Sequence, residues 1–204
     1  MGASTFVEAG QVAGRIGPNA IVRVAEALPA RIGAAATHAV FEAAGLAHYL
    51  RTPPASMVDE AEVRRLHEAL RRELGLPLAR EVAREAGSRT ARYLLAHRIP
   101  RLAQRVLKLL PAPVAARALL AAIGRHAWTF AGSGAFSAHA GHPTVLTIRG
   151  NPMCEGLQAD APACDFYAAT FEGLFSALVH PASQVIETGC MAQGAPACVF
   201  EVRW

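Results

Sequence analysis

Lysine is almost absent from this chain: Lys108 is the single lysine, and the other nineteen basic residues are arginines. Aromatic residues are also scarce, at 6% of the 204 residues, while apolar residues make up 52% and charged residues 18%. This balance is typical of a folded globular protein and excludes a disordered or low-complexity chain. A chain of this length can bury a sizeable core within one large domain.

Long hydrophobic runs are missing too. The longest, "ALLAAIG" and "LFSALV", fall far short of the ~20 apolar residues that a bilayer span needs. The N-terminus has no basic region followed by an apolar segment, so we expect no secretory signal. The sequence therefore predicts a cytoplasmic protein with reduced thiols, and peripheral contact with a membrane stays open.

The net charge is +4, but the basic residues alternate with glutamate in stretches such as "EVRRLHEALRREL". This alternation is typical of a solvated helix face. We therefore do not expect nucleic acid as a partner.

Residues 1–125 have the pattern of a mainly helical part. Pro18 stands near the first turn of a helix, and a second helix is expected over 33–50. Asp59 can cap a third helix over 60–74, which should end at Gly75 because glycine and the following proline disfavour helix. Three further helical patterns follow in "REVAREAGSRTARYLLAH", "RIPRLAQRVLKLLP" and "PVAARALLAAIGRHAW".

Residues 126–204 have a different texture, rich in threonine, aromatic and β-branched residues. "WTFAGSGAFSA" and "PTVLTIRG" predict a β-hairpin, "APACDFYAATFEGLFSALV" a helix, and "SQVIETGC" and "ACVFEVRW" two more strands. The sequence therefore predicts an α+β fold, with N-terminal helices followed by a strand-strand-helix-strand-strand unit and an antiparallel sheet. We expect the two parts to form one integrated domain.

Two of the four cysteines lie close together in "ETGCMAQGAPAC". Antiparallel pairing around the turn brings Cys190 and Cys198 together, and Cys164 at the start of the preceding helix can reach them. With Glu187 they form a set of ligands suited to a tetrahedral, closed and therefore structural Zn²⁺ site. The alternative is that these cysteines are small buried apolar residues, since there is no C-x-x-C pair. Cys154 lies outside this set and is open to three roles: a buried thiol, a substitute ligand or a pocket residue.

Cys164, the 22-residue gap after it, and the motifs "ETGC" and "APAC" resemble the 4-vinyl reductase domain family. In sensor members of that family, three cysteines and one glutamate hold a zinc beside the ligand pocket. The resemblance implies zinc at Cys164, Glu187, Cys190 and Cys198. The stretches "RIGPNAI", "AWTFAGSGAF" and "GNPMC" are similar to the members that act in bacteriochlorophyll biosynthesis.

The family name implies reduction of the 8-vinyl group (4-vinyl in older naming) of a chlorophyll precursor, which needs a source of hydride. "GSGAFS" lacks the later glycine of a dinucleotide fingerprint, and the cysteines lack ferredoxin spacing. We therefore predict a binding role: a carrier or accessory factor for a Mg-tetrapyrrole such as protochlorophyllide or chlorophyllide. The alternatives are the reductase itself, with catalytic residues that the sequence does not identify, and a small-ligand sensor. Pathway enzymes are expected partners, and family resemblance implies a homodimer.

A flat apolar pigment needs an apolar wall, an axial ligand for its metal and few polar anchors. Our candidates on the first hairpin and its flanks are His126, Trp128, Phe130, Phe136, His139 and His142. The competing interpretation is that the histidines are exposed loop residues and the aromatics are core. His38, His48, His67 and His97 lie on helical patterns and are expected to be ordinary surface or boundary residues.

Overall fold

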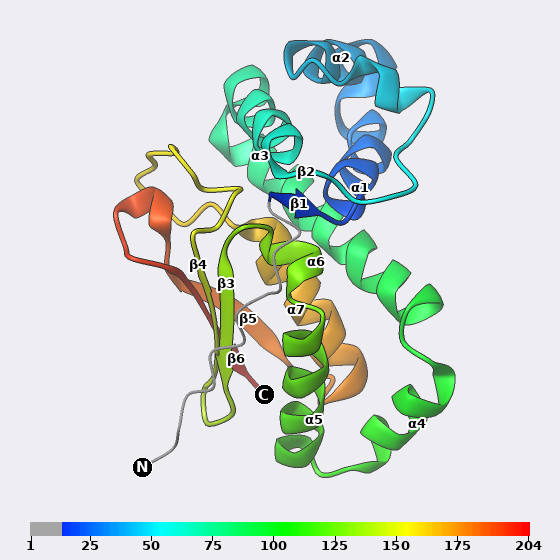
Figure 1. Cartoon of the computed structure of the whole chain (residues 1–204), viewed down its shortest axis with the longest axis vertical. Helices are drawn as coiled ribbons and strands as arrows, with labels where there is room; N and C mark the ends of the chain where they lie inside the picture. The colour runs from blue at the N-terminus through cyan, green and yellow to red at the C-terminus, as the bar shows by residue number, and fades with distance from the viewer. Residues whose placement is uncertain (1–13) are drawn as a thin grey trace.

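The computed structural model describes residues 14–204, arranged as a helical part beside a four-stranded sheet (Figure 1). The helical part begins with a two-stranded antiparallel pair, β1 (Arg15–Ile16) and β2 (Val58–Asp59). Its helices are α1 (Asn19–Ala27), α2 (Pro29–Ala43), the 3-10 helix η1 (Ala47–Leu50), α3 (Glu60–His97), α4 (Arg101–Leu109) and α5 (Ala112–Arg125).

The rest of the chain is the predicted strand-strand-helix-strand-strand unit. After the short helix α6 (Trp128–Ala131) it contains β3 (Ala135–His139), β4 (Thr144–Arg149), α7 (Asp165–Leu178), β5 (Gln184–Gly189), the 3-10 helix η2 (Met191–Gln193) and β6 (Cys198–Arg203). The strands form an antiparallel sheet in the order β3-β4-β6-β5. Every second residue of β4 and β6 is buried, because α7 covers that face of the sheet (Figure 1). The predicted α+β fold with an antiparallel sheet is confirmed.

The predicted boundaries of the third helix are partly correct. The Asp59 side chain caps α3 by accepting a hydrogen bond from the N–H of Ala61 at 2.8 Å. Gly75 has a φ of 74° and interrupts the helical backbone as expected, but helix resumes at once and continues to His97. Pro77 lies in the first turn of the resumed segment, where its missing N–H costs no hydrogen bond.

The predicted first strand of the hairpin starts too early. Trp128 and Phe130 lie in α6, one turn of helix whose N–H groups bond back to the end of α5, and only Phe136 lies in β3. Gly132, with a φ of 59°, ends this turn, and the N–H and hydroxyl of Ser133 both donate to the Glu60 carboxylate. This long-range contact with α3 overrides the local β propensity of the aromatic residues.

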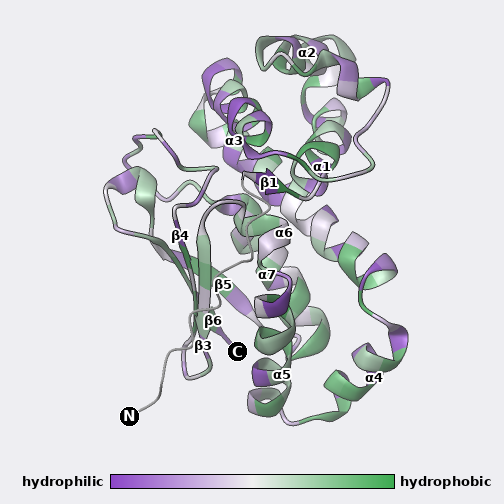
Figure 2. Ribbon diagram, in the orientation of Figure 1, coloured by the Kyte–Doolittle hydropathy of each residue, from purple (hydrophilic) through white to green (hydrophobic). Residues whose placement is uncertain are grey.

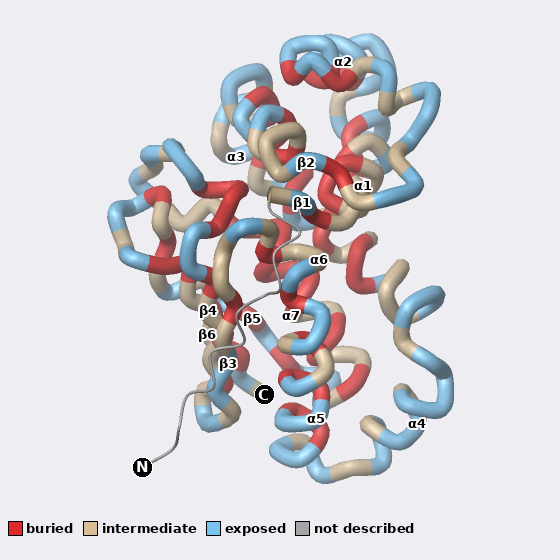
Figure 3. Tube along the Cα trace, in the orientation of Figure 1, coloured by how far each residue is buried: buried red, intermediate tan, exposed pale blue. Residues whose placement is uncertain are grey.

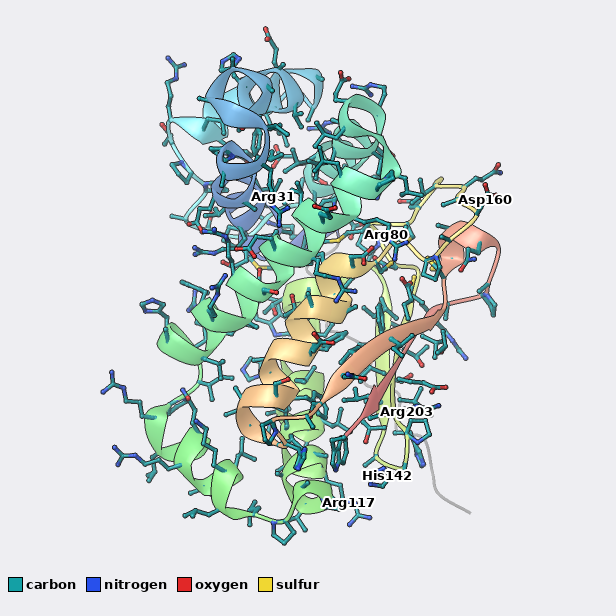
Figure 4. All side chains as sticks on the ribbon, turned by 180° about the vertical axis from the view of Figure 1, so that it is seen from behind. Arg31, Arg80, Arg117, His142, Asp160 and Arg203 are labelled. Atoms are coloured by element: carbon teal, nitrogen blue, oxygen red, sulfur yellow. The ribbon has the colours of Figure 1, made fainter. Side chains whose placement is uncertain are left out.

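The centre of the molecule is the packing of α3 against α7, and small residues allow it. A Cβ on Gly87 would lie 2.2 Å from the carbonyl oxygen of Phe166, and one on Gly173 would lie 2.6 Å from the Cβ of Ala91. The two helices therefore touch backbone to backbone. At the upper end of α7, Arg80 and Arg84 of α3 pair with Asp165 at 2.8 and 3.3 Å (Figure 4 labels Arg80).

We expect Gly87→Ala to destabilise the fold by ~2 kcal/mol or more, because the added methyl group overlaps a backbone oxygen that cannot move alone. Gly124→Ala, in the middle of α5 where an added Cβ meets nothing within 4 Å, should instead stabilise by about 0.5–1 kcal/mol. Urea unfolding of the two variants measures both changes. Equal effects of the two substitutions would contradict the close helix contact.

Candidate metal centre

Four cysteines from four parts of the chain meet at one end of the sheet. Cys154 lies in the loop after β4, Cys164 precedes α7, Cys190 follows β5, and Cys198 begins β6. All four side chains are buried, and their Sγ atoms all lie within 4.8 Å of one another. The Sγ of Cys154 is 3.0 Å from that of Cys164 and 3.8 Å from those of Cys190 and Cys198.

Asn151 supports this cluster with hydrogen bonds. Its side chain is fully buried, and its Nδ2 donates to the Sγ of Cys164 at 3.2 Å and of Cys198 at 3.3 Å. Its Oδ1 accepts from the N–H of Met153 at 3.0 Å, which fixes the orientation of the amide. An amide N–H that points at sulfur favours the thiolate over the thiol.

The four thiols share their protons unequally. Hydrogen bonds from Cys154, Cys164 and Cys190 hold the pKa of Cys198 well below its usual value. The pKa of Cys190 is lowered to about 6 by hydrogen bonds from Cys154 and Cys164. The pKa of Cys164 is raised, because it is a donor in the network and is buried. The cluster thus favours at least one thiolate before any metal binds.

A cation lies beside these sulfurs. Arg71 of α3 donates from Nη2 to the carbonyl oxygen of Met153 at 3.4 Å. Burial lowers the pKa of Arg71, while negative charge on Cys154 and Cys164 raises it. The guanidinium can therefore compensate part of the charge of a thiolate cluster.

Glu187 lies next to the cluster and faces it differently. Its Oε2 accepts the N–H of Cys164 at 2.9 Å, while its Oε1 is buried without a hydrogen-bond partner. Burial raises the pKa of this carboxyl to about 8, and the charge of Cys190 adds to the increase. A buried oxygen with no partner needs a proton or a cation.

Of the four predicted ligands, the structure brings the thiols of Cys164, Cys190 and Cys198 together and places Glu187 beside them. It also adds Cys154, whose role the sequence left open. Asn151 and Arg71 were missed: Asn151 lies in "GNPMC" three residues before a cysteine, a weak signal, and Arg71 is one of several arginines on a helix. Only the fold distinguishes Arg71 from its neighbours.

The predicted pigment residues separate into two groups. His126, Trp128 and Phe130 lie together at the junction of α5 and α6, and Phe136 is buried beneath them with its ring 5.3 Å from that of Phe130. The Nδ1 of His126 is 2.9 Å from the carbonyl oxygen of Ala122. Because a carbonyl only accepts, Nδ1 carries the proton, and the lone pair of the ring is on Nε2.

The other two predicted histidines lie at the far end of the hairpin. His139 ends β3, four residues and thus ~13 Å along the strand from Ala135. His142 lies in the β3–β4 turn, with its ring 5.0 Å from that of Trp204. Both are exposed. A single planar ligand bound at His126 would not contact this end through its axial position.

His67 was expected to be an ordinary surface or boundary residue, and that expectation is wrong. The side chain is 4% exposed, and its ring meets the edge of Phe166 at 5.9 Å. Its Nε2 is buried without a partner, and burial lowers its pKa to about 3, with the charge of Arg71 as a second cause. The reason is the crossing of α3 and α7, which covers a helix face that reads as mixed in the sequence.

Because His67 is neutral in the fold and protonates near pH 6.5 when unfolded, its contribution to stability is present above pH 6.5 and is lost as the pH falls toward 3. We expect about 2 kcal/mol of this loss at pH 5. His67→Leu should remove that part of the pH dependence, whereas the exposed His139→Leu should leave it unchanged. Urea unfolding at pH 7 and pH 5 measures it. An unchanged slope in His67→Leu would contradict the assignment.

The comparisons with known proteins agree with this architecture. The family model of the 4-vinyl reductase (vinyl-4-reductase) domain matches residues 144–204, which contain all four cysteines and Glu187. The "Bacteriochlorophyll synthase 23 kDa chain" of Cereibacter sphaeroides is 46% identical over 94% of this chain and 91% of its own length. The protein of the same name from Rhodobacter capsulatus is 39% identical over 91% of this chain and 85% of its own.

Among solved structures, an H-NOX protein from S. oneidensis has the same overall fold. The TM-score is 0.53 at 13% identity, and the match covers 92% of this chain and 98% of that one. Another structure, described as modulating heme redox potential through protein-induced porphyrin distortion, matches with a TM-score of 0.51 at 12% identity over 93% of this chain and all of its own. The two sequence relatives settle the family: the chain belongs to the 4-vinyl reductase domain proteins represented by the bacteriochlorophyll synthase 23 kDa chains.

Proposed function

We propose that this protein of the bacteriochlorophyll pathway binds a Mg-tetrapyrrole intermediate, such as protochlorophyllide or chlorophyllide, as a carrier or accessory factor, and holds a structural zinc. The observation that carries the zinc is the convergence of four buried thiols. The pathway follows from relatives that match nearly the whole chain. The two parts of the proposal rest on different residues and are tested separately.

The cysteine cluster fits zinc in geometry and in chemistry. A tetrahedral zinc with sulfur ligands at about 2.3 Å needs sulfurs that are ~3.8 Å apart. The Sγ of Cys154 lies 3.8 Å from those of Cys190 and Cys198, and Cys164 lies 3.5 Å from Cys198. The amide of Asn151 and the guanidinium of Arg71 supply the outer hydrogen bonds and the positive charge that such a site needs.

Cys164, Cys190 and Cys198 would supply three ligands, and two residues compete for the fourth position. The geometry favours Cys154, because its sulfur already lies among the other three. Glu187 is the competitor that family resemblance implies, since its buried Oε1 has no partner. In either arrangement four protein ligands close the site, so the metal would tie α7, β5, β6 and the loop after β4 together.

For the pigment, the junction of α5 and α6 has the right groups. The Nε2 of His126 carries a lone pair and is held outward by the Nδ1 bond to Ala122. Trp128 is 40% exposed beside it, and Phe130 rests on Phe136. A neutral imidazole can be an axial ligand of magnesium, and the indole can cover the edge of the macrocycle. In this proposal His126, Trp128 and Phe130 bind and orient the pigment, and Phe136 supports them.

The H-NOX neighbours share only the fold with this chain, so the pigment proposal rests on pathway membership and on the residues at this junction. One of those neighbours is described by its heme and porphyrin distortion, which is consistent with a tetrapyrrole in this fold. A pathway carrier needs stoichiometric binding, not turnover. Work next to a membrane would suit an apolar cargo, although no helix in residues 14–204 is both long and apolar enough to cross one.

The fourth zinc ligand can be identified by replacing the two competitors. We expect purified protein to contain about one zinc per chain. Cys154→Ser should lose most of the metal and, in protein loaded with Co²⁺, weaken the thiolate-to-cobalt charge-transfer absorption. Glu187→Gln should keep that absorption and lower affinity by only ~10–100-fold, as an outer-shell residue does. The opposite pattern would make Glu187 the ligand. An unchanged chain that binds neither metal would overturn the site.

Pigment binding is tested by absorbance titration with divinyl and monovinyl protochlorophyllide, with and without NADPH. We expect a saturable shift of the pigment bands near one pigment per chain and no conversion. His126→Ala should weaken binding by at least ~10-fold, while His142→Ala, at the far end of the hairpin, should have no effect. Multiple turnovers of divinyl to monovinyl pigment would identify a reductase. Binding of neither pigment would leave the sensor alternative.

A further inference from the structure

Helix α4 stands apart from the body of the protein. No residue of Arg101–Leu109 is buried, and Figure 3 shows it as an exposed segment between α3 and α5. Its inner side is nevertheless fixed. Gln104 donates from Nε2 to the carbonyl oxygens of Leu95 and Ile99 at 2.6 and 2.8 Å, and Leu107 packs against the core. The opposite side of the helix therefore faces solvent permanently.

That outer side carries an apolar stripe. Leu102 is 72% exposed, Val106 49% and Leu109 85%, and their spacing of four and three residues places them on one helix face. Val114, 44% exposed, lies just beyond at the start of α5. Large exposed apolar side chains in a contiguous group mark an interaction surface.

The polar residues that border the stripe are all basic. Arg101, Arg105 and Lys108 recur at the same helical spacing, one step around the helix from the apolar stripe. Figure 2 shows the resulting alternation of hydrophilic and hydrophobic segments along α4. The surrounding sequence has no counter-charge: from residue 86 to residue 154 the chain contains no Asp or Glu. This region is therefore a persistent source of positive potential.

We propose that α4 is an interfacial helix that docks the protein on an anionic lipid bilayer. Leu102, Val106 and Leu109 would enter the boundary between headgroups and acyl chains, while Arg101, Arg105 and Lys108 bind lipid phosphates. A lipid surface explains both halves of the helix. A nucleic acid would leave the leucines in water, and a second copy of α4 would bring two rows of positive charge together.

This inference gives a site to the membrane-side location suggested for the pigment carrier, and to that extent it rests on the proposed function. It does not depend on the pigment or on the metal for its test. Residues 101–109 lie on a different part of the molecule from the cysteine cluster, at the lower edge in Figure 1. Lipid binding can therefore be measured on pigment-free protein.

The experiment is cosedimentation of the full chain with vesicles of phosphatidylcholine alone and of phosphatidylcholine with phosphatidylglycerol at 3:1. We expect binding to the anionic vesicles that weakens as salt rises. The triple variant Arg101→Gln, Arg105→Gln and Lys108→Gln should lose affinity by about a hundredfold, since each basic residue contributes ~5-fold. Leu102→Gln with Leu109→Gln should lose at least ~10-fold.

Matched controls use residues with the same chemistry elsewhere on the surface. Ile186→Gln removes an apolar side chain that is 57% exposed on β5, and Arg72→Gln removes an exposed charge on α3. Both controls should bind vesicles as the unchanged chain does. Equal binding to neutral vesicles, equal loss in the controls, or no vesicle binding at all would overturn the proposal.

Sedimentation velocity separates the remaining occupant. A dimer that Leu102→Gln with Leu109→Gln dissociates, in a protein that does not bind vesicles, would make α4 a subunit interface and would overturn lipid docking. Failure of pigment binding with intact vesicle binding would instead reject the proposed function and leave this inference standing.

Discussion

The close contact of α3 and α7 is the constraint on which the rest of the molecule depends. Gly87 and Gly173 let the two backbones touch, and the Arg80–Asp165 pair sets the position of the upper end of α7. Cys164 directly precedes that end, so the helix contact also places the first thiol above the sheet. The covered face buries His67 and orients Arg71 toward the same place. One packing contact thus builds both the core and the surroundings of the cysteines.

The cluster lies where separate parts of the fold meet. Each thiol comes from a different element or loop, so the thiols are brought together only when α7, the β5–β6 hairpin and the loop after β4 are all in place. In the unfolded chain these groups would be far apart, and a metal that binds only the assembled set would stabilise the fold. Such a metal would act as a cross-link that a cell able to supply zinc does not need to form by oxidation.

Much of this could be predicted from the sequence, and the failures have identifiable causes. Strand periodicity and turn residues predicted the sheet, and antiparallel register predicted that Cys190 and Cys198 lie close together. Trp128 and Phe130 were placed in a strand because their local propensity favours one, whereas a contact between Ser133 and Glu60 across the fold favours a helical turn. Cys154 could not be assigned because loop geometry, not spacing, brings it to the other thiols. His67 lies on a helix face that looks ordinary until α7 covers it.

The scarcity of lysine has a practical consequence when it is placed on the structure. Lys108 is exposed on α4, and every other cation of the chain is an arginine or a histidine. Among side chains, amine-directed reagents can therefore modify one position only. A fluorophore or crosslinker attached there would report on the surroundings of this helix alone, so one label can follow what approaches α4 without any engineered residue.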